Sequence, residues 1–220
     1  NSPNNPTGVL YSRKELQELA RVLKAHSNKL GKAVYLISDD PYKKITFDGV
    51  EAPNIMEFYQ DSIYITSHSK DIALPGERIG FLAVHPQCES AGLLMAGLIF
   101  CNRVLGFVNA PALIQRVVKQ VQGVTVDVEQ YRRKRDYLYN ELTRIGYQVV
   151  KPQGAFYFFP KSPLEDEVEF VKKLADKKVL VVPGRGFGLP GYFRISYCLP
   201  DSVIEGSIAG FEKAYHECQA

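Results

Sequence analysis

Ser67-His68-Ser69-Lys70-Asp71-Ile72-Ala73-Leu74-Pro75-Gly76-Glu77-Arg78 is the stretch of this sequence that decides the fold. The apolar run Ile-Tyr-Ile-Thr at residues 63–66 precedes it and predicts a buried strand, and residues 79–84 predict another. A lysine in a tight turn at the end of a buried strand can be held in an apolar cleft. Its amine then loses a proton more easily and becomes a nucleophile.

Groups that suit a phosphate lie beside this lysine. Ser67 and Ser69 supply hydroxyls, and Arg78 supplies a guanidinium eight residues after Lys70. A nucleophilic amine next to a phosphate cradle indicates pyridoxal phosphate, held as a Schiff base on Lys70.

The residues before this stretch predict a strand–helix–strand order. Turn-forming residues fill positions 1–8, a capping-box spacing opens a helix at Ser12, and residues 34–37 predict a short strand. Short apolar strands without alternation are typical of a mostly parallel sheet covered on both faces. Ligands of such sheets bind at the carboxyl ends of the strands, which is where four candidate residues fall: Asn5, Asp39, Tyr42 and Lys70.

The pattern changes in the second half of the chain. A long helix with one apolar stripe is predicted from Asp127 to Gly146, and its basic run at 132–135 is expected to be a solvated face rather than a polyanion site. Short strands and two more helices are predicted after it: strands 147–150, 155–159, 179–182 and 192–197, a helix opened by a capping box at 162–165, and a last helix capped by Asp201. This order indicates an α+β unit that begins near residue 120.

Bulk properties exclude several classes of protein. The net charge of +3 over 220 residues is too small to indicate nucleic acid or an anionic membrane as a partner. The four cysteines lie far apart, so reduced thiols in a cytoplasmic protein are expected and a zinc site is not. The chain opens at Asn1 inside an apparent ligand-binding loop, and we therefore expect it to be part of a longer protein.

Four motifs together resemble a known family: Asn5-Pro6-Thr7-Gly8, Asp39-x-Pro41-Tyr42, Ser67-x-Ser69-Lys70 with Arg78, and Arg194-Ile195-Ser196. Their order and spacing resemble the class I/II aminotransferases, which are fold-type I pyridoxal-phosphate enzymes related to aspartate aminotransferase. The resemblance implies an α/β fold in two parts. Residues 1–120 would be the C-terminal part of a large cofactor-binding domain with a mostly parallel sheet, its N-terminal half missing. Residues 121–220 would be a smaller α+β domain.

The resemblance also implies a role for each residue. Lys70 would form the Schiff base and move the substrate proton, and Asp39 would keep the pyridine nitrogen protonated, with Asp40 as the weaker candidate. The remaining roles would be hydrogen bonds to the cofactor phenolate from Tyr42 and Asn5, phosphate binding by Ser67, Ser69 and Arg78, and binding of the substrate carboxylate by Arg194 with Asn5.

Structural roles compete with some of these assignments. Taken alone, Lys70 could pair with Asp71, and Arg194 could form an interdomain salt bridge. A structural role is favoured for Arg103 over contact with a substrate side chain, and the role of Arg185 is left open.

The function implied is amino transfer between an amino acid and a 2-oxo acid, by a homodimer. One alternative is another enzyme of the same scaffold, a β-lyase or an aminocyclopropane-carboxylate synthase. A second alternative is a non-catalytic sensor domain of a transcription regulator. The preferred amino acid is left open. We expect this polypeptide alone to bind the cofactor weakly, to be poorly active and to expose apolar surface.

Overall fold

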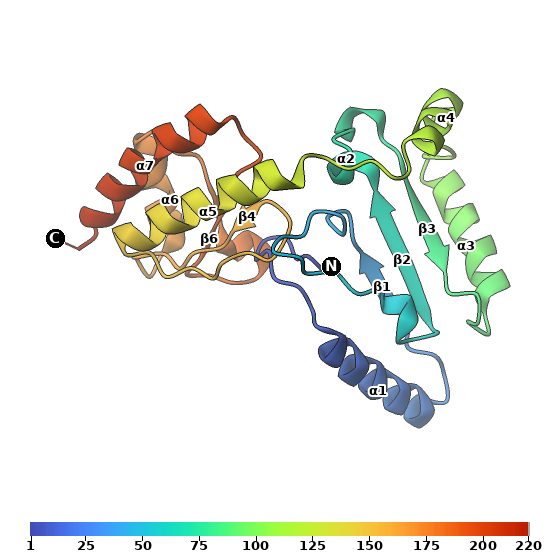
Figure 1. The fold of residues 1–220 in the computed structure, drawn as a ribbon. Coiled ribbons are helices and arrows are strands. Elements are labelled where there is room, and N and C mark those ends of the chain that lie inside the picture. Colours follow the sequence, from blue (N-terminus) through green and yellow to red (C-terminus); the bar gives the residue numbers. More distant parts are fainter. Residues whose placement is uncertain (220) are drawn as a thin grey trace. The chain divides into compact units, whose positions relative to one another are not determined.

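The computed structural model describes residues 1–219, which group into two compact units (Figure 1). Unit 1 comprises residues 1–2, 10–45 and 51–126. Unit 2 comprises residues 3–9 and 46–50 together with the chain from residue 127 onward. The division into domains at residues 1–120 and 121–220 stays a prediction. The two compact units differ from it in that unit 2 also contains two short N-terminal segments.

A mixed sheet forms the centre of unit 1. In the described residues it has three strands in the order β1-β2-β3. The strands are β1 (Leu36–Asp39), β2 (Ser62–Ser67) and β3 (Gly80–Val84). β1 pairs with β2 in parallel, whereas β2 pairs with β3 antiparallel, so that Ser67 lies opposite Gly80. The short connection from β2 to β3 explains the antiparallel pair, because a parallel return needs a long crossover.

The helices of unit 1 include the one predicted to open at Ser12. They are α1 (Arg13–Leu30), α2 (His68–Asp71), α3 (Ala91–Val104) and α4 (Ala112–Gln120), with 3-10 turns η1 (Ile55–Glu57) and η2 (Pro75–Glu77). The capping box predicted for α1 is confirmed, since Glu15 N donates to Ser12 Oγ over 3.2 Å and Ser12 N donates to Glu15 Oε2 over 2.7 Å. Gly31 ends α1 in the left-handed conformation with φ 63°.

Large apolar side chains of unit 1 stay exposed. Ile37 in β1 is 59% exposed, and Phe81 in β3 is 50% exposed. Helix α3 adds Leu93 and Phe100, which are 78% and 65% exposed. The strand pattern predicts a sheet whose two faces are both covered. Within the described residues, these side chains of β1, β3 and α3 are not covered.

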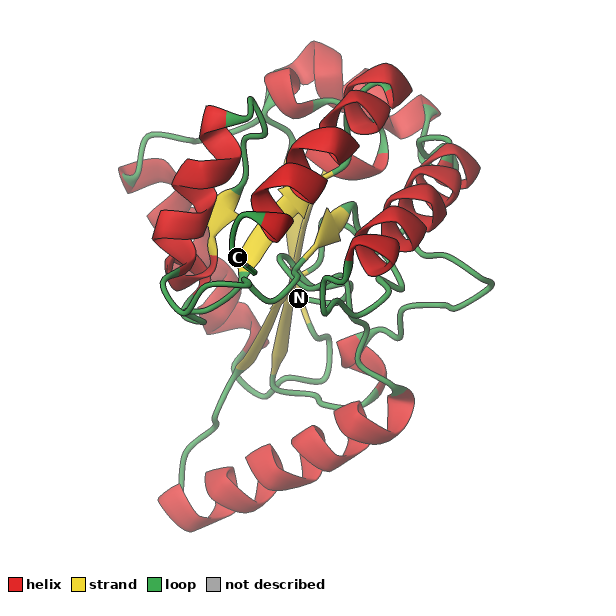
Figure 2. Cartoon of the chain, turned by 90° about the vertical axis from the view of Figure 1, so that its left-hand side faces the viewer, coloured by secondary structure: helices red, strands yellow, loops and turns green. Residues whose placement is uncertain are grey.

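Unit 2 pairs a small antiparallel sheet with three helices. Its strands, in the order β4-β6-β5 within the described residues, are β4 (Tyr157–Phe158), β6 (Phe193–Ser196) and β5 (Val182–Pro183). Its helices are α5 (Val128–Ile145), α6 (Glu167–Asp176) and α7 (Asp201–His216), with the 3-10 turn η3 (Gly184–Phe187). Helix α7 packs against both α5 and α6. Figure 2 shows how much more of the chain is helix than strand.

Several predictions for unit 2 are wrong. Residues 147–150 form no strand, and of the strand predicted at 179–182 only Val182 belongs to one, β5. Helix α6 begins after Asp166, whose carboxylate accepts from Val168 N over 2.9 Å, whereas Ser162 accepts from Leu164 N in a separate turn. Asp201 lies inside α7, and Pro200 occupies the cap position. At Ser162 the local signal was satisfied by a turn rather than by the helix that such a signal usually opens.

Aromatic side chains build the core of unit 2. Tyr147 contacts Phe170, Phe193 and Phe211 with ring centroids 5.9–6.2 Å apart. Its hydroxyl donates to the main-chain oxygen of Phe211 over 3.0 Å, and burial raises the pKa of Tyr147 above its ordinary value. Tyr147 therefore contributes to the fold through packing and not through a sheet.

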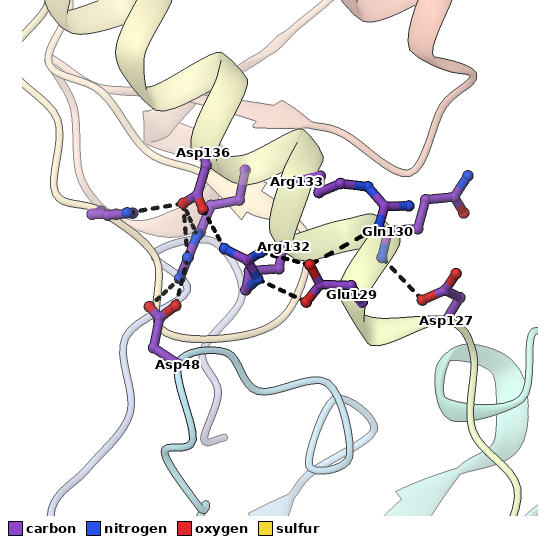
Figure 3. A network of polar contacts seen from close by, with 9 residues as sticks. Asp48, Asp127, Glu129, Gln130, Arg132, Arg133 and Asp136 are labelled. Atoms are coloured by element: carbon purple, nitrogen blue, oxygen red, sulfur yellow. Dashed lines mark hydrogen bonds and ion pairs between the residues drawn. The ribbon is translucent and has the colours of Figure 1, made fainter.

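A buried arginine corrects the prediction for the basic run of α5. Arg135 is 1% exposed and donates to both oxygens of Asp48 over 2.7 and 2.9 Å, and to Pro152 O over 3.1 Å. Arg132 does lie on the solvated face, between Glu129 and Asp136 of the same helix (Figure 3). Arg135 points inward because it occupies the apolar stripe of α5, one turn before Leu138.

Candidate functional site

The lysine turn of unit 1 is built at the end of β2. Ser67 caps α2, and its Oγ accepts from Ser69 N over 3.1 Å. The hydroxyls of Ser67 and Ser69 lie 2.7 Å apart. Lys70 is half-buried at the third position of α2. The sequence-predicted amine and both predicted hydroxyls therefore belong to one short turn.

Asp71 fixes this turn through its side chain and its main chain. Its buried carboxylate contacts Lys44 Nζ at 3.3 Å and His68 Nδ1 at 3.2 Å. Its main-chain oxygen accepts from Thr125 Oγ1 over 2.9 Å and from Val126 N over 2.8 Å. Asp71 thus anchors the turn to the last residues of unit 1.

The two aspartates at the end of β1 have different surroundings. Asp40 is buried and accepts from Ser2 N over 2.9 Å and from Ser38 Oγ over 2.7 Å. Asp39 is exposed at the strand end, and partial burial together with the charge of Asp40 raises the pKa of its carboxyl group. Both oxygens of Asp40 therefore accept hydrogen bonds within the protein, whereas Asp39 is the more accessible carboxylate; its role toward a ligand stays a prediction. Tyr42 follows as a buried side chain.

Arg78 lies in the turn that leads into β3. It adopts the left-handed conformation with φ 50°, and its Nη1 donates to Pro75 O over 2.7 Å while the side chain is exposed. Two residues later β3 approaches β2 closely, since a Cβ on Gly80 would lie 2.4 Å from Thr66 O. The register pairs Gly80 with Ser67. The turn that carries Arg78 therefore ends beside the same end of β2 from which the lysine turn starts.

Arg194 and Asn5 come together in unit 2. Arg194 lies in β6, and its Nη1 donates to Asn5 Oδ1 over 3.0 Å, although the residues are 189 positions apart. The centre of its guanidinium lies 4.8 Å from the Tyr157 ring and 4.7 Å from the Phe187 ring. Its Nε is buried and has no hydrogen-bond partner among the described residues. The structure thus holds a guanidinium whose hydrogen-bonding capacity is only partly used.

The loop that carries Asn5 is fixed on residues 152–154. Gly8 O accepts from Gln153 N over 2.9 Å and from Gly154 N over 3.0 Å. Gly8 has φ 69°, and a Cβ there would lie 2.5 Å from Pro152 Cβ. Only glycine fits this approach, which explains the glycine in the Asn-Pro-Thr-Gly motif.

Arg185 has a clear structural partner, which the sequence did not reveal. Its Nε donates to Glu167 Oε1 over 2.8 Å, and its Nη2 donates to Asp166 Oδ1 over 2.7 Å. Glu167 is fully buried, and the signal for this was its place on the face of α6 that continues with Phe170 and Leu174. Arg103 lies exposed on α3, and nothing in unit 1 assigns it a ligand.

The buried carboxylate of Glu167 predicts a pH dependence of stability. Hydrogen bonds from the Arg185 side chain and from Gly191 N lower the pKa of Glu167 to about 2. A group whose pKa falls on folding stabilises the protein above its unfolded pKa, and this contribution disappears as the pH falls toward the folded value. Glu167→Gln should therefore be less stable than the unmodified protein at pH 6, and the difference should shrink between pH 4.5 and pH 2. Thermal unfolding of both proteins across this range tests the prediction, and a constant difference would contradict it.

The predicted residues of unit 1 offer the kinds of group that pyridoxal phosphate would require. Asp39 offers a carboxylate suited to a ring nitrogen, Lys70 offers an amine suited to an aldehyde, and the hydroxyls of Ser67 and Ser69 with the Arg78 guanidinium suit a phosphate. Within residues 1–219 no cluster of His, Cys, Asp or Glu could hold a metal ion. None of the helices in that range is both long and apolar enough to cross a membrane.

The fold is that of the aspartate-aminotransferase type. A crystal structure of an aminotransferase from Eubacterium rectale matches the whole chain with a TM-score of 0.96 and 40% identity, and the match covers 55% of that protein. The aspartate aminotransferase structure from Thermotoga maritima matches 97% of the chain with a TM-score of 0.80 and 28% identity, over 54% of its own length.

Sequence comparison identifies the family. The model of the family "Aminotransferase class I and II" matches residues 1–209, and the chain therefore belongs to this family. A probable aspartate aminotransferase from Methanocaldococcus jannaschii is 34% identical over 218 residues, which cover 94% of this chain and 55% of that protein. Aromatic-amino-acid aminotransferase 2 from Thermococcus litoralis is 30% identical over 99% of this chain and 56% of that protein. The chain spans about half the length of these relatives.

Proposed function

We propose that the full-length protein is a transaminase that uses pyridoxal phosphate to move an amino group between an amino acid and a 2-oxo acid. Family membership supports the reaction class. The observation that carries the proposal is the contact between Asn5 and Arg194 in unit 2, because it presents a half-satisfied guanidinium to a carboxylate ligand.

Unit 1 supplies the residues that hold the cofactor. Ser67, Ser69 and Arg78 would bind its phosphate, and Lys70 would bind its aldehyde carbon. Asp39 would hold the proton on the ring nitrogen, for which its exposed carboxylate is suited. When bound, pyridoxal phosphate supplies an electron sink for the bond that breaks at the substrate α-carbon.

Lys70 also has a part in proton transfer. Once a substrate amine has displaced it from the cofactor, the Lys70 amine would move the proton from the substrate α-carbon to the cofactor carbon that carried the aldehyde. The turn is suited to this, because Asp71 anchors it through Lys44, His68 and the main chain of residues 125–126. A fixed backbone lets the side chain return to the same place after each exchange.

Unit 2 supplies the residues that hold the substrate. Arg194 would bind the α-carboxylate with its planar fork, and Asn5 would orient that fork through the bond to Nη1. In unit 1, Tyr42 is proposed to hydrogen-bond the cofactor phenolate, and its burial restricts its orientation.

Direct assay of the full-length protein tests this function. The cofactor-loaded protein is incubated with an amino acid and 2-oxoglutarate, beginning with aspartate and the aromatic amino acids, because relatives carry these names. Stoichiometric formation of glutamate and the new 2-oxo acid supports the proposal. Release of ammonia and pyruvate would instead identify a β-lyase, and tight cofactor binding without turnover would favour a sensor.

A lysine in place of Arg194 should weaken substrate binding. Arg194→Lys keeps the charge but removes the planar fork, so we expect the KM for the amino donor to rise at least about tenfold. Steady-state kinetics measure this, with Arg144→Lys as the control, because Arg144 is an exposed arginine of unit 2 that pairs with Glu141 and Glu212. An unchanged KM in Arg194→Lys would show that another group binds the carboxylate.

A further inference from the structure

One buried carboxylate closes the loop of residues 184–191. Glu167 Oε1 accepts from Arg185 N over 3.1 Å and from Arg185 Nε over 2.8 Å, at the beginning of the loop. Its other oxygen, Oε2, accepts from Gly191 N over 3.0 Å, at the end of the loop. Glu167 is 0% exposed, so this carboxylate links both ends of the loop from inside unit 2.

The base of the loop is tightly packed. Gly184 N donates to Tyr192 O over 2.7 Å, and Leu189 N donates to Gly184 O over 3.2 Å. A Cβ on Gly184 would lie 2.4 Å from Leu189 O and 2.6 Å from Tyr192 O, so no larger residue fits. The loop is therefore closed by main-chain bonds at its base and by Glu167 beneath it.

The loop carries an aromatic ring to Arg194. Phe187 is the last residue of η3, and its ring lies 4.7 Å from the centre of the Arg194 guanidinium. Phe159 supports Phe187 in an edge-on contact with centroids 6.1 Å apart. Tyr157 provides the second ring near the guanidinium, from β4. Rings at this distance attract the cation and limit the orientations of its plane.

We propose that Glu167 is a positioning residue, which clamps residues 184–191 so that Phe187 holds the Arg194 guanidinium in one orientation for a carboxylate ligand. This inference rests on the proposed role of Arg194. It assigns Phe187 a part in specificity for planar anions, because a guanidinium with a fixed plane donates two parallel hydrogen bonds from one side to a carboxylate. A clamp of this kind acts on binding and leaves proton transfer unaffected.

The clamp is tested through the coupling between its two ends. Four variants of the full-length, cofactor-loaded protein are compared: Glu167→Gln, Phe187→Leu, the double variant, and Phe187→Tyr. Glu169→Gln is the matched control, because Glu169 lies exposed on the same helix and carries the same charge. The measured quantities are kcat, the KM for the amino donor, and the Kd of succinate by NMR titration, since succinate has carboxylates but no amine.

Phe187→Leu should raise KM and the succinate Kd about fivefold to tenfold, with kcat changed less than about twofold. Glu167→Gln should act in the same direction, and the double variant should be no worse than Phe187→Leu, because Glu167 acts through Phe187. Phe187→Tyr should retain normal values because it keeps the ring, and Glu169→Gln should match the unmodified protein. If Glu167→Gln does not fold, Glu167→Asp takes its place.

Two results would overturn the clamp. One is a normal KM and succinate Kd in Phe187→Leu. The other is a double variant whose effect equals the product of the single effects, since Glu167 would then act independently of Phe187. The proposed function fails separately: if no amino transfer occurs but succinate binding still follows this pattern and is weakened by Arg194→Lys, the clamp stands without the reaction.

Discussion

Lys70→Ala in the full-length, cofactor-loaded protein should slow amino transfer at least about a thousandfold, because the amine is proposed both to bind the cofactor and to move the proton. Position in the chain supports this expectation, since Lys70 follows Ser69 in the turn in which the hydroxyls of Ser67 and Ser69 lie 2.7 Å apart. Assay with 2-oxoglutarate measures the loss. Borohydride reduction followed by peptide mapping provides a second readout, because the cofactor should be fixed on Lys70 in the unmodified protein and absent from the variant.

Lys43 provides a demanding control for this prediction. It is also a half-buried lysine of unit 1, and burial lowers its pKa, as expected for a nucleophilic amine. Lys43→Ala should nevertheless retain most of the activity, because Lys43 does not belong to the lysine turn. Loss of activity in Lys43→Ala with activity retained in Lys70→Ala would show that the wrong lysine had been chosen.

The buried pair of Arg135 and Asp48 should have the largest effect on stability. Asp48→Ala removes the partner that binds Arg135 in two hydrogen bonds and leaves a buried guanidinium with less compensation. We expect a loss of about 2 kcal/mol in the free energy of unfolding, below the roughly 3–5 kcal/mol typical of a broken buried pair, because Asp48 is itself half exposed. Denaturant unfolding monitored by circular dichroism measures this loss.

Two further variants show whether burial is the cause. The double variant Arg135→Met with Asp48→Ala should recover much of the lost stability, since an apolar side chain in the stripe of α5 carries no charge that needs compensation. Glu129→Ala breaks an exposed pair with Arg132 on the same helix and should change stability little (Figure 3). An equal loss in Asp48→Ala and Glu129→Ala would show that burial of Arg135 is not what makes its pair matter.

The elements that were predicted best are those whose own residues carry a clear local signal, such as a cap or a short apolar run. Helix α1 follows from the capping box at Ser12 and the glycine at position 31, and β2 follows from its short apolar run. Arg135 shows where such reasoning fails. Periodicity places position 135 in the apolar stripe of α5, whereas its charge and its basic neighbours favour solvent. Arg135 is buried in the stripe because Asp48, 87 positions earlier, supplies a carboxylate as its partner. No local sequence pattern predicts this contact.

The candidate residues were predictable, but several of their contacts were not. Motifs named Asn5 and Arg194, while their hydrogen bond depends on a chain reversal over 189 positions. The sequence favoured Asp39 over Asp40 but did not show how their surroundings differ: Ser2 and Ser38 donate to Asp40, whereas Asp39 is exposed. Glu167 escaped notice because a glutamate in the first turn of a helix is ordinarily a solvated residue.

The discontinuous make-up of unit 2 has a consequence for dissection of the gene. Residues 3–9 bring Asn5 to Arg194, and residues 46–50 bring Asp48 to Arg135, so both key arginines take partners encoded far upstream. Expression of residues 121–220 as an independent module would separate each arginine from that partner. During synthesis, Asn5 and Asp48 are likewise translated long before Arg194 and Arg135. The contacts of unit 2 between these residues therefore form only late in synthesis.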